Sequence, residues 1–430
     1  MRSVELEKSR VALSAPVLMR QSAILMAGSL IVTICLTAFR LIATRSLGAS
    51  EYGVLAALLT PGAVIAAAAT SASAMVARLM AEAHAKGNDR RIARLHRLVP
   101  VFSIATLLLG VAVAVLFRGT LSTFLKVDDG VAVMASVVSA TAILSAALLR
   151  GLLQGAQRFG RLALSHIADG LGKALLGSAA ILIGLGASGG MMAFACAALG
   201  AGVLTYFLGR SATFDDRLKD EVSENAVARG AWTIAAFLLL ASLIQVDSFL
   251  ARHYLTPHLA GLYAAAVLPG RAVATLMTFL GTMMLPKATH HATRGTSGSG
   301  LLARILLLGG GISILAIAAF WAFPAEILAF AAGSHYGAAQ SIIFPAGLAG
   351  VLWGITNIIV AYQIGFGRFV FLIPLSVAAV GEIVGIAAFH RSGAEIVESF
   401  LYANTLAIIS CFAVAGISRL TRTPARLGVS

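Results

Sequence analysis

The chain has 430 residues, of which 59% are hydrophobic and only 12% are charged, and its mean hydropathy is +0.92. Soluble globular domains contain about 45–50% apolar and about 25% charged residues, so this composition excludes a soluble protein and indicates a membrane protein. The formal net charge is +14, but no basic stripe with interleaved aromatic residues is present, which argues against a nucleic-acid partner.

Apolar stretches of about 20 residues, long enough to cross a bilayer as helices, recur along the whole sequence. The first stretch is too long for the core of a signal peptide, and Arg45 follows it rather than a small-residue cleavage site. We therefore predict an all-α integral membrane protein. Its twelve predicted transmembrane helices are residues 22–44, 53–77, 98–117, 131–149, 162–184, 190–209, 231–251, 261–285, 302–323, 341–362, 369–390 and 397–418.

Basic residues are distributed unevenly between the two sides of the predicted membrane. If both termini are cytoplasmic, most of the lysines and arginines between helices face the cytoplasm, among them Arg150 after the fourth helix. Cytoplasmic loops of membrane proteins carry such an excess, so we place both termini in the cytoplasm. The basic residues left in the outer loops are Arg45, Arg118, Lys126, Arg252 and Arg391.

A shift of 208 residues aligns the second predicted helix with the eighth, so that Gly53, for example, falls on Gly261. The twelve helices therefore form two halves of six. Because six is even, both halves start on the same side, and we expect parallel repeats related by an axis along the membrane normal. The predicted parts are an N-terminal six-helix lobe at 1–209, a cytoplasmic linker at 210–230, and a C-terminal six-helix lobe at 231–430 that ends in a short tail.

Each half carries a Pro-Gly pair inside an apolar run, Pro61-Gly62 in the first and Pro269-Gly270 in the second. Proline removes a backbone donor and clashes with the preceding turn, so we predict a helix break at both pairs. The freed carbonyl groups need partners in protein or in a water-filled cavity, and transporters place such breaks at the interface between repeats. A passive kink that only improves packing is the alternative.

Charged residues inside predicted membrane helices are candidates for function, because each costs at least about 2.5–3.5 kcal/mol at a helix centre. Asp169 and Lys173 are four residues apart and share a helix face, so mutual neutralisation is the alternative to a functional role for this pair. The six candidates are Arg40, Asp169, Lys173, Asp247, Arg271 and Glu382.

The repeat places opposite charges at related positions. Arg40 falls one residue from the counterpart of Asp247, and a shift of 209 places Lys173 on Glu382. We therefore predict that Arg40 and Asp247 form a gate pair across the outer mouth. Arg271 has no charged counterpart, and we assign it to phosphate binding, because arginine binds phosphate bidentately and stays charged when buried. A structural contact with Glu382 or with carbonyl groups is the alternative.

The sequence contains no motif of an enzyme or of a metal site. A P-loop, a nucleophile elbow and a soluble nucleotide-binding domain are all absent. Cys35, Cys196 and Cys411 have no pairing or ligand spacing, and His290 with His291 is interpreted as a surface pair. We therefore expect no catalytic residue, metal or cofactor.

Three stretches carry a resemblance to a known family: RSLGASEYGVLAALLTPGAVI, LLQGAQRFGRLALS and QVDSFLARHYLTPHLAGLYAAAVLPGRAV. They resemble the polysaccharide flippase branch of the MATE-like multidrug, oligosaccharidyl-lipid and polysaccharide exporter (MOP) superfamily, and the resemblance extends over essentially the whole chain. Asp247, Gly261 and Tyr263 match pattern residues of that family. The chain ends after the twelfth helix, which counts against the fourteen-helix lipid II flippase branch.

The resemblance implies a bacterial inner-membrane protein that moves an undecaprenyl-pyrophosphate-linked oligosaccharide to the periplasmic leaflet for surface polysaccharide biosynthesis. Such proteins alternate between inward-open and outward-open lobes around a cationic cavity, driven by an H+ or Na+ gradient. Further implied partners are membrane lipids, a polysaccharide polymerase and glycosyltransferases, and a monomer is the expected state. The implied substrate-binding residues are Arg271, Lys173 and Arg40, and the implied gate or ion-coupling residues are Asp247, Glu382 and Asp169.

Two other functions compete with this interpretation. A cation or drug antiporter of the same fold would need an acidic and aromatic cavity, which the 7% aromatic content and the buried cations disfavour. A membrane scaffold without transport activity would leave the symmetric Pro-Gly pairs and the intramembrane charges unexplained.

Overall fold

The computed structural model describes residues 15–85, 88–210, 226–293, 296 and 298–420, and this part of the chain is helical without strands. The helices are α2 (Ala15–Ala85), α3 (Asp89–Leu125), α4 (Gly130–Gly155), α5 (Phe159–Leu182), α6 (Gly186–Arg210), α7 (Ala226–Tyr254), α8 (Pro257–Ala266), α9 (Leu268–Thr293), α10 (Ser299–Ala322), α11 (Pro324–Ala331), the 3-10 helix η1 (Ser334–Ala339), α12 (Gln340–Gly365), α13 (Leu372–Ala388) and α14 (Gly393–Leu420).

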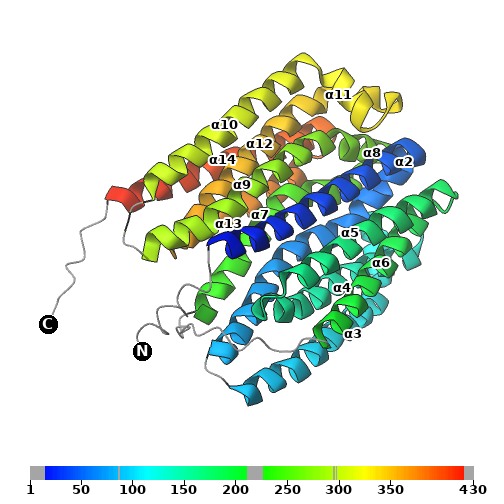
Figure 1. Cartoon of the computed structure of the whole chain (residues 1–430). Coiled ribbons are helices and arrows are strands. Elements are labelled where there is room, and N and C mark those ends of the chain that lie inside the picture. Colours follow the sequence, from blue (N-terminus) through cyan, green and yellow to red (C-terminus); the bar gives the residue numbers. More distant parts are fainter. Residues whose placement is uncertain (1–14, 86–87, 211–225, 294–295, 297, 421–430) are drawn as a thin grey trace, which may run out of the picture.

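The predicted all-α membrane fold with twelve crossings is confirmed. Nine helical segments in the described residues are long and apolar enough to cross a membrane. One of them, within α2, contains two crossings joined at Gly48, whose φ of 70° is a conformation that favours glycine. Figure 1 shows the chain reversing direction there. The remaining two crossings are the 17-residue α13 and α5, which carries Asp169 and Lys173.

The predicted helix break at Pro61 and Gly62 is wrong, because α2 is continuous through both residues. A single missing backbone hydrogen bond is tolerated in a membrane helix when neighbouring groups satisfy the freed carbonyl. In the second half the helix is interrupted at Val267, between α8 and α9. Pro269 and Gly270 therefore lie in the first turn of α9, where the missing proline N–H costs no helix hydrogen bond.

Among the described residues, the buried apolar clusters join the two halves of the chain at one end. The largest cluster combines residues of both halves, such as Leu55 of α2 and Tyr263 of α8. Two smaller clusters belong to one half each, one around Met80 and the other around Met284. In Figure 1 the two bundles correspondingly meet at the end that holds α8, α11 and the Gly48 turn. The halves are thus packed together at this end, which we call the Gly48 end, and separately at the other.

Symmetry-related glycines lie at the contact between the halves. A Cβ atom added to Gly53 would come within 2.8 Å of the Gly261 backbone nitrogen, and one added to Gly261 would overlap the carbonyl oxygen of Ala49. Gly53 and Gly261 are the positions that the 208-residue shift aligns. Two equivalent backbone segments therefore touch each other, as expected near the axis of two parallel repeats.

Hydrogen bonds between the halves at the Gly48 end also occur in two equivalent sets. The donor residues of the first half align with the donor residues of the second half at the 208-residue shift. Every acceptor in these bonds is a backbone carbonyl oxygen. The bonds join Thr44 Oγ1 to Ala331 (3.0 Å), Arg45 Nη2 to Phe330 (2.7 Å), Arg252 Nε to Leu125 (2.9 Å) and His253 Nδ1 to Phe124 (2.8 Å).

The turn before α4 supplies a local test of the fold. Asp129 Oδ1 accepts hydrogen bonds from the amides of Val131 (2.9 Å) and Ala132 (3.3 Å), which are among the donors that a helix start leaves unpaired. A hydrogen bond from Ser188, together with these amides, lowers the pKa of the Asp129 carboxyl. The charged carboxylate is therefore the form that stabilises this helix start.

Replacing Asp129 with alanine is expected to destabilise the protein by about 0.5–2 kcal/mol, the usual value of such a cap. Because folding lowers the Asp129 pKa, the carboxylate's contribution is complete above the unfolded-state pKa and is lost as pH falls through the folded-state pKa. Thermal unfolding in detergent between about pH 7 and about pH 3 should show the Tm difference shrinking in acid. Asp129→Asn should retain most of the stability without this pH dependence, and a pH-independent effect of Asp129→Ala would contradict capping by the carboxylate.

Candidate functional site

A cavity of about 440 Å³ lies wholly within the first half of the chain, between α2, α4, α5 and α6. Its apolar wall includes Phe39, Ile143 and Met191, and Gly62 of the predicted break also lines it. The charged residues that line this cavity are Arg40, Arg150, Asp169 and Lys173.

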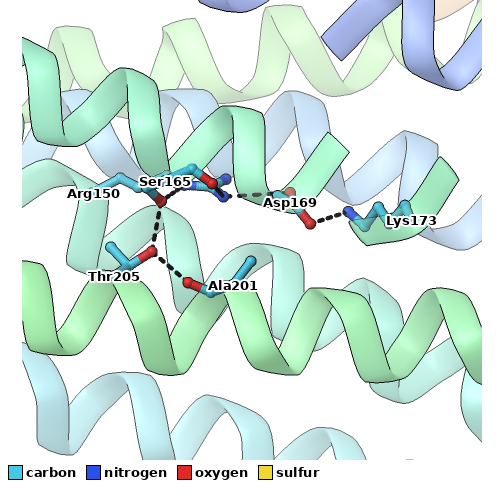
Figure 2. A network of polar contacts seen from close by, with 6 residues as sticks. All are labelled: Arg150, Ser165, Asp169, Lys173, Ala201 and Thr205. Atoms are coloured by element: carbon cyan, nitrogen blue, oxygen red, sulfur yellow. Dashed lines mark hydrogen bonds and ion pairs between the residues drawn. The ribbon is translucent and has the colours of Figure 1, made fainter. Parts of the chain in front are cut away.

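Asp169 joins two cations of the cavity into one network, which Figure 2 shows. Asp169 Oδ1 lies 2.8 Å from Lys173 Nζ, and Asp169 Oδ2 lies 3.3 Å from Arg150 Nη2. The ion pair between Asp169 and Lys173, which their spacing allows, is therefore present. Arg150 also contacts Asp169, so the network has three members. Three residues carry a formal charge of +1 in total, and only about 5% of the surface of each cation is exposed.

Arg150 is the main residue that the sequence prediction misplaced. It was assigned to a cytoplasmic loop, but α4 extends to Gly155 and places Arg150 in the cavity wall. The charge of Arg150 interrupts the apolar run after residue 149, so the hydropathy pattern does not show that the helix continues to Gly155. The spacing of the residues could have placed Arg150 in the cavity wall. Ser139, Ile143 and Ala147 precede Arg150 at intervals of three or four residues and line the same cavity.

The cavity has a cationic surplus. Arg40, Arg150 and Lys173 supply three positive charges, Asp169 supplies one negative charge, and His166 adds a titratable ring. Among the described residues, no group of three His, Cys, Asp or Glu side chains is arranged to hold a metal ion. This chemistry suits an anionic ligand, because fixed cations replace the hydration that such a ligand loses in the membrane.

The second half contains a different charged cluster, around Asp247 of α7. This residue has no exposed surface, and its Oδ1 atom lies 2.5 Å from Arg271 Nη2 of α9. Tyr263 donates to Asp247 Oδ2 (2.8 Å), and Arg271 also donates to Ser248 Oγ (2.9 Å). Both carboxylate oxygens of Asp247 are therefore occupied within the second half.

The predicted gate pair of Arg40 and Asp247 is not formed in this structure, because Arg271 takes the position of the cation beside Asp247. Arg40 instead lines the cavity of the first half and lies within electrostatic reach of Arg271 across the interface between the halves. Arg271 does make a structural contact, as the alternative to phosphate binding held, but its partner is Asp247 and not Glu382 or a carbonyl group. The repeat could not reveal this pair, since Arg271 has no charged counterpart.

Glu382 lies on α13 and is 99% buried, with an exposed fraction of 1%. Its Oε1 atom has no hydrogen-bond partner among the described residues. Asp247 and Arg271 are both within electrostatic reach of it. The second half therefore buries two carboxyl groups and one guanidinium close together, whereas the first half places two cations around one carboxylate. This reversal of charge between the halves agrees with the repeat, which aligns the cation Lys173 with the acid Glu382.

The predicted histidine pair lies outside this site. His291 Nδ1 is 2.7 Å from Thr296 Oγ1, and the side chain of His290 lies outside the described residues. His291 lies near the end of α9 and lines a surface hollow together with Thr296 and Arg304, apart from the charged clusters.

Comparison with known proteins identifies the fold. No protein-family model and no curated protein sequence matches the chain. An inward-facing multidrug resistance MATE family transporter of the MOP superfamily is similar in structure, with a TM-score of 0.61, 16% identity, and coverage of 91% of this chain and 96% of that chain. The eukaryotic MATE transporter AtDTX14 gives a TM-score of 0.64 at 11% identity, over 93% of this chain and 96% of that one.

The lipid II flippase MurJ, in an inward closed conformation, gives a TM-score of 0.67 at 11% identity, over 91% of this chain and 87% of that chain. These solved proteins are transporters and a flippase. The chain is thus a multi-pass membrane protein with the two-lobe, twelve-helix fold of the MATE transporters of the MOP superfamily.

Proposed function

We propose that this protein is a flippase that moves an undecaprenyl-pyrophosphate-linked oligosaccharide from the cytoplasmic to the periplasmic leaflet of a bacterial inner membrane. The observation that carries the proposal is the cavity of the first half, where Arg40, Arg150 and Lys173 outnumber Asp169 within a transmembrane bundle. A diphosphate headgroup cannot cross hydrocarbon unpaired, and buried cations beside a cavity offset its loss of water. The lipid tail stays in the bilayer while the sugar passes between the lobes.

The conformation is compatible with uptake of a substrate from the cytoplasmic side. With the termini in the cytoplasm, as the distribution of basic residues indicates, the Gly48 end faces the periplasm and is closed by contacts between the halves. The separate apolar clusters of the two halves then lie on the cytoplasmic side. This is the arrangement expected of a protein that accepts its substrate from the cytoplasmic leaflet.

An H+ or Na+ gradient is the proposed energy source. Of the three candidate acids, Asp169 and Asp247 are held by ion pairs, whereas Glu382 makes no ion pair with the described residues. A buried carboxyl outside an ion pair can take up and release a proton when the lobes move. Glu382 is therefore the proposed proton carrier, and a sodium dependence of transport would contradict this role.

The decisive experiment uses a strain that lacks the gene. We expect lipid-linked oligosaccharide to accumulate and surface polysaccharide to be lost, and the wild-type gene to restore both. Lys173→Ala at matched membrane levels should restore at most about a tenth of the export, since a lost buried ionic contact to a phosphate costs more than about 1.4 kcal/mol. Arg118→Gln, which changes an exposed arginine at the end of α3, is the matched control.

The competing antiporter function predicts a different result in the same strain. Unchanged glycan pools combined with sensitivity to cationic drugs would replace the flippase proposal with a cation antiporter. A cavity with a surplus of positive charge repels organic cations, which is the reason for preferring the flippase.

A further inference from the structure

Asp169 is placed between the two buried cations of the first-half cavity and leaves Lys173 incompletely satisfied. Lys173 Nζ lies 2.8 Å from Asp169 Oδ1, yet this oxygen accepts no aligned hydrogen bond from the described residues. The contact is therefore an ion pair without hydrogen-bond geometry. A second contact of Lys173 is the face of the Phe194 ring, 5.1 Å away. An ammonium has three N–H donors, so Lys173 has donors to spare for a ligand.

Arg150 is held in a fixed orientation. Its Nε atom donates to Ser165 Oγ (2.8 Å), and its Nη2 atom donates to the Ser165 carbonyl oxygen (3.2 Å). Thr205 donates its hydroxyl hydrogen to the Ala201 carbonyl oxygen (2.6 Å), so Ser165 Oγ donates to Thr205 Oγ1 (2.6 Å). Figure 2 shows this chain of bonds running from α4 through α5 to α6. The guanidinium is thus oriented before any ligand arrives, which lowers the entropic cost of binding.

We propose that Arg150 and Lys173 form a diphosphate-binding subsite, and that Asp169 is a built-in competing anion that holds this subsite until a diphosphate displaces it. The inference rests on the proposed flippase function and specifies where its headgroup binds. One carboxylate offers each cation a single oxygen, whereas a diphosphate carries more charge and more acceptor oxygens and can bind the guanidinium bidentately. A monoanion gains no such advantage over Asp169, so the competition selects for a multiply charged group.

The rest of the cavity has a place for a sugar. Ser139 is buried, lines the cavity, and its hydroxyl has no hydrogen-bond partner among the described residues. It lies on the same face of α4 as Arg150, about 16 Å farther along the helix at 1.5 Å per residue. A ligand bound through its diphosphate at Arg150 therefore reaches this hydroxyl only through groups that lie beyond the diphosphate, farther along the cavity. An unpaired buried hydroxyl is costly, and a ligand would remove that cost.

The competing anion has a mechanistic consequence for release. When the diphosphate leaves, Asp169 returns to both cations, so neither is left uncompensated in the membrane. Asp169 thus weakens binding and speeds dissociation. Replacing it with asparagine keeps the shape of the side chain but removes the charge. We therefore expect Asp169→Asn to bind diphosphate at least about tenfold more tightly and to export more slowly.

The test measures binding to the purified full-length protein in detergent by calorimetry, with undecaprenyl diphosphate and inorganic pyrophosphate as separate probes. We expect wild type to bind both, Asp169→Asn to bind both more tightly, and Lys173→Gln to bind both at least about tenfold more weakly. Arg118→Gln is the control with unchanged affinity. Arg150→Lys tests the bidentate contact, and the Tm of each variant shows whether it is folded.

The outcomes separate this subsite from the proposed function. Equal affinities of wild type, Asp169→Asn and Lys173→Gln for undecaprenyl diphosphate would overturn the subsite while leaving the flippase proposal standing. Tighter binding of inorganic pyrophosphate by Asp169→Asn, without binding of the lipid, would support the subsite but contradict the lipid-linked substrate. If wild type bound neither probe, the subsite would be wrong, and the glycan pools of the deletion strain would independently decide the function.

Discussion

Replacing Arg271 with alanine is expected to destabilise the protein by about 3–5 kcal/mol, because it leaves the Asp247 carboxylate buried without a cation. Asp247 has no exposed surface, and Arg271 is its ion-pair partner. Unfolding of the purified protein in detergent, followed by Tm and by denaturant titration, measures the loss. We also expect less protein in the membrane, so export by this variant must be compared at matched levels.

A double variant tests whether the charges of Asp247 and Arg271 serve only stability or also transport. The double variant Asp247→Asn with Arg271→Gln removes both charges and should recover most of the stability, so the two single effects should be strongly non-additive. Additive losses would show that the pair is not energetically coupled. A stable double variant that exports normally would remove Arg271 and Asp247 from the substrate path and the gate, leaving them a structural role.

Replacing Gly261 with alanine is expected to open the Gly48 end, because the added Cβ atom would overlap the carbonyl oxygen of Ala49 in the other half. Overpacking of this kind costs about 1–3 kcal/mol, and a coupling of that size changes a conformational equilibrium by about 5–150-fold. The halves should separate at this end, and the conformation that is closed at the Gly48 end should lose population. Distances between spin labels on the two lobes measure the separation, and export should fall by at least about tenfold.

Two further glycines test this explanation. Gly53→Ala should act like Gly261→Ala, because its Cβ atom would lie 2.8 Å from the Gly261 nitrogen at the same contact. Gly381→Ala is the control, since no atom lies within 4 Å of its added Cβ, and its effect on stability should stay within about 0.5 kcal/mol. A loss with Gly381→Ala as large as that with Gly261→Ala would show that the contact with Ala49 is not the cause, because alanine is a better helix former than glycine.

The number of membrane crossings and the twofold repeat could be predicted because both depend on patterns local in sequence. Long apolar runs dictate helices in a bilayer, and the aligned pairs such as Gly53 and Gly261 reveal the duplication. Helix ends were less predictable where a charge interrupts the apolar run, as at Arg150. Pro61 was misread because the neighbours that satisfy a freed carbonyl are tertiary, and sequence spacing does not contain them.

The charged site could be predicted in part. Residue type and depth identified Lys173, Asp169, Asp247, Arg271 and Glu382 as buried charges, and the structure places all five inside helices. Their partners are determined by how helices pack. The i,i+4 pair on α5 could be predicted because it lies on one helix, whereas the Arg271 to Asp247 contact joins two helices and has no equivalent in the other half.

The hydrogen bonds that close the Gly48 end accept at main-chain oxygens, so they are indifferent to the side chains of the accepting residues. The accepting residues of the two halves can therefore differ in sequence while the bonds are the same. The donors also differ: Thr44 and Arg45 in one half correspond to Arg252 and His253 in the other, and each still reaches a carbonyl oxygen. Contacts made to the main chain therefore let the two halves differ in their buried charges without losing their fit at this end.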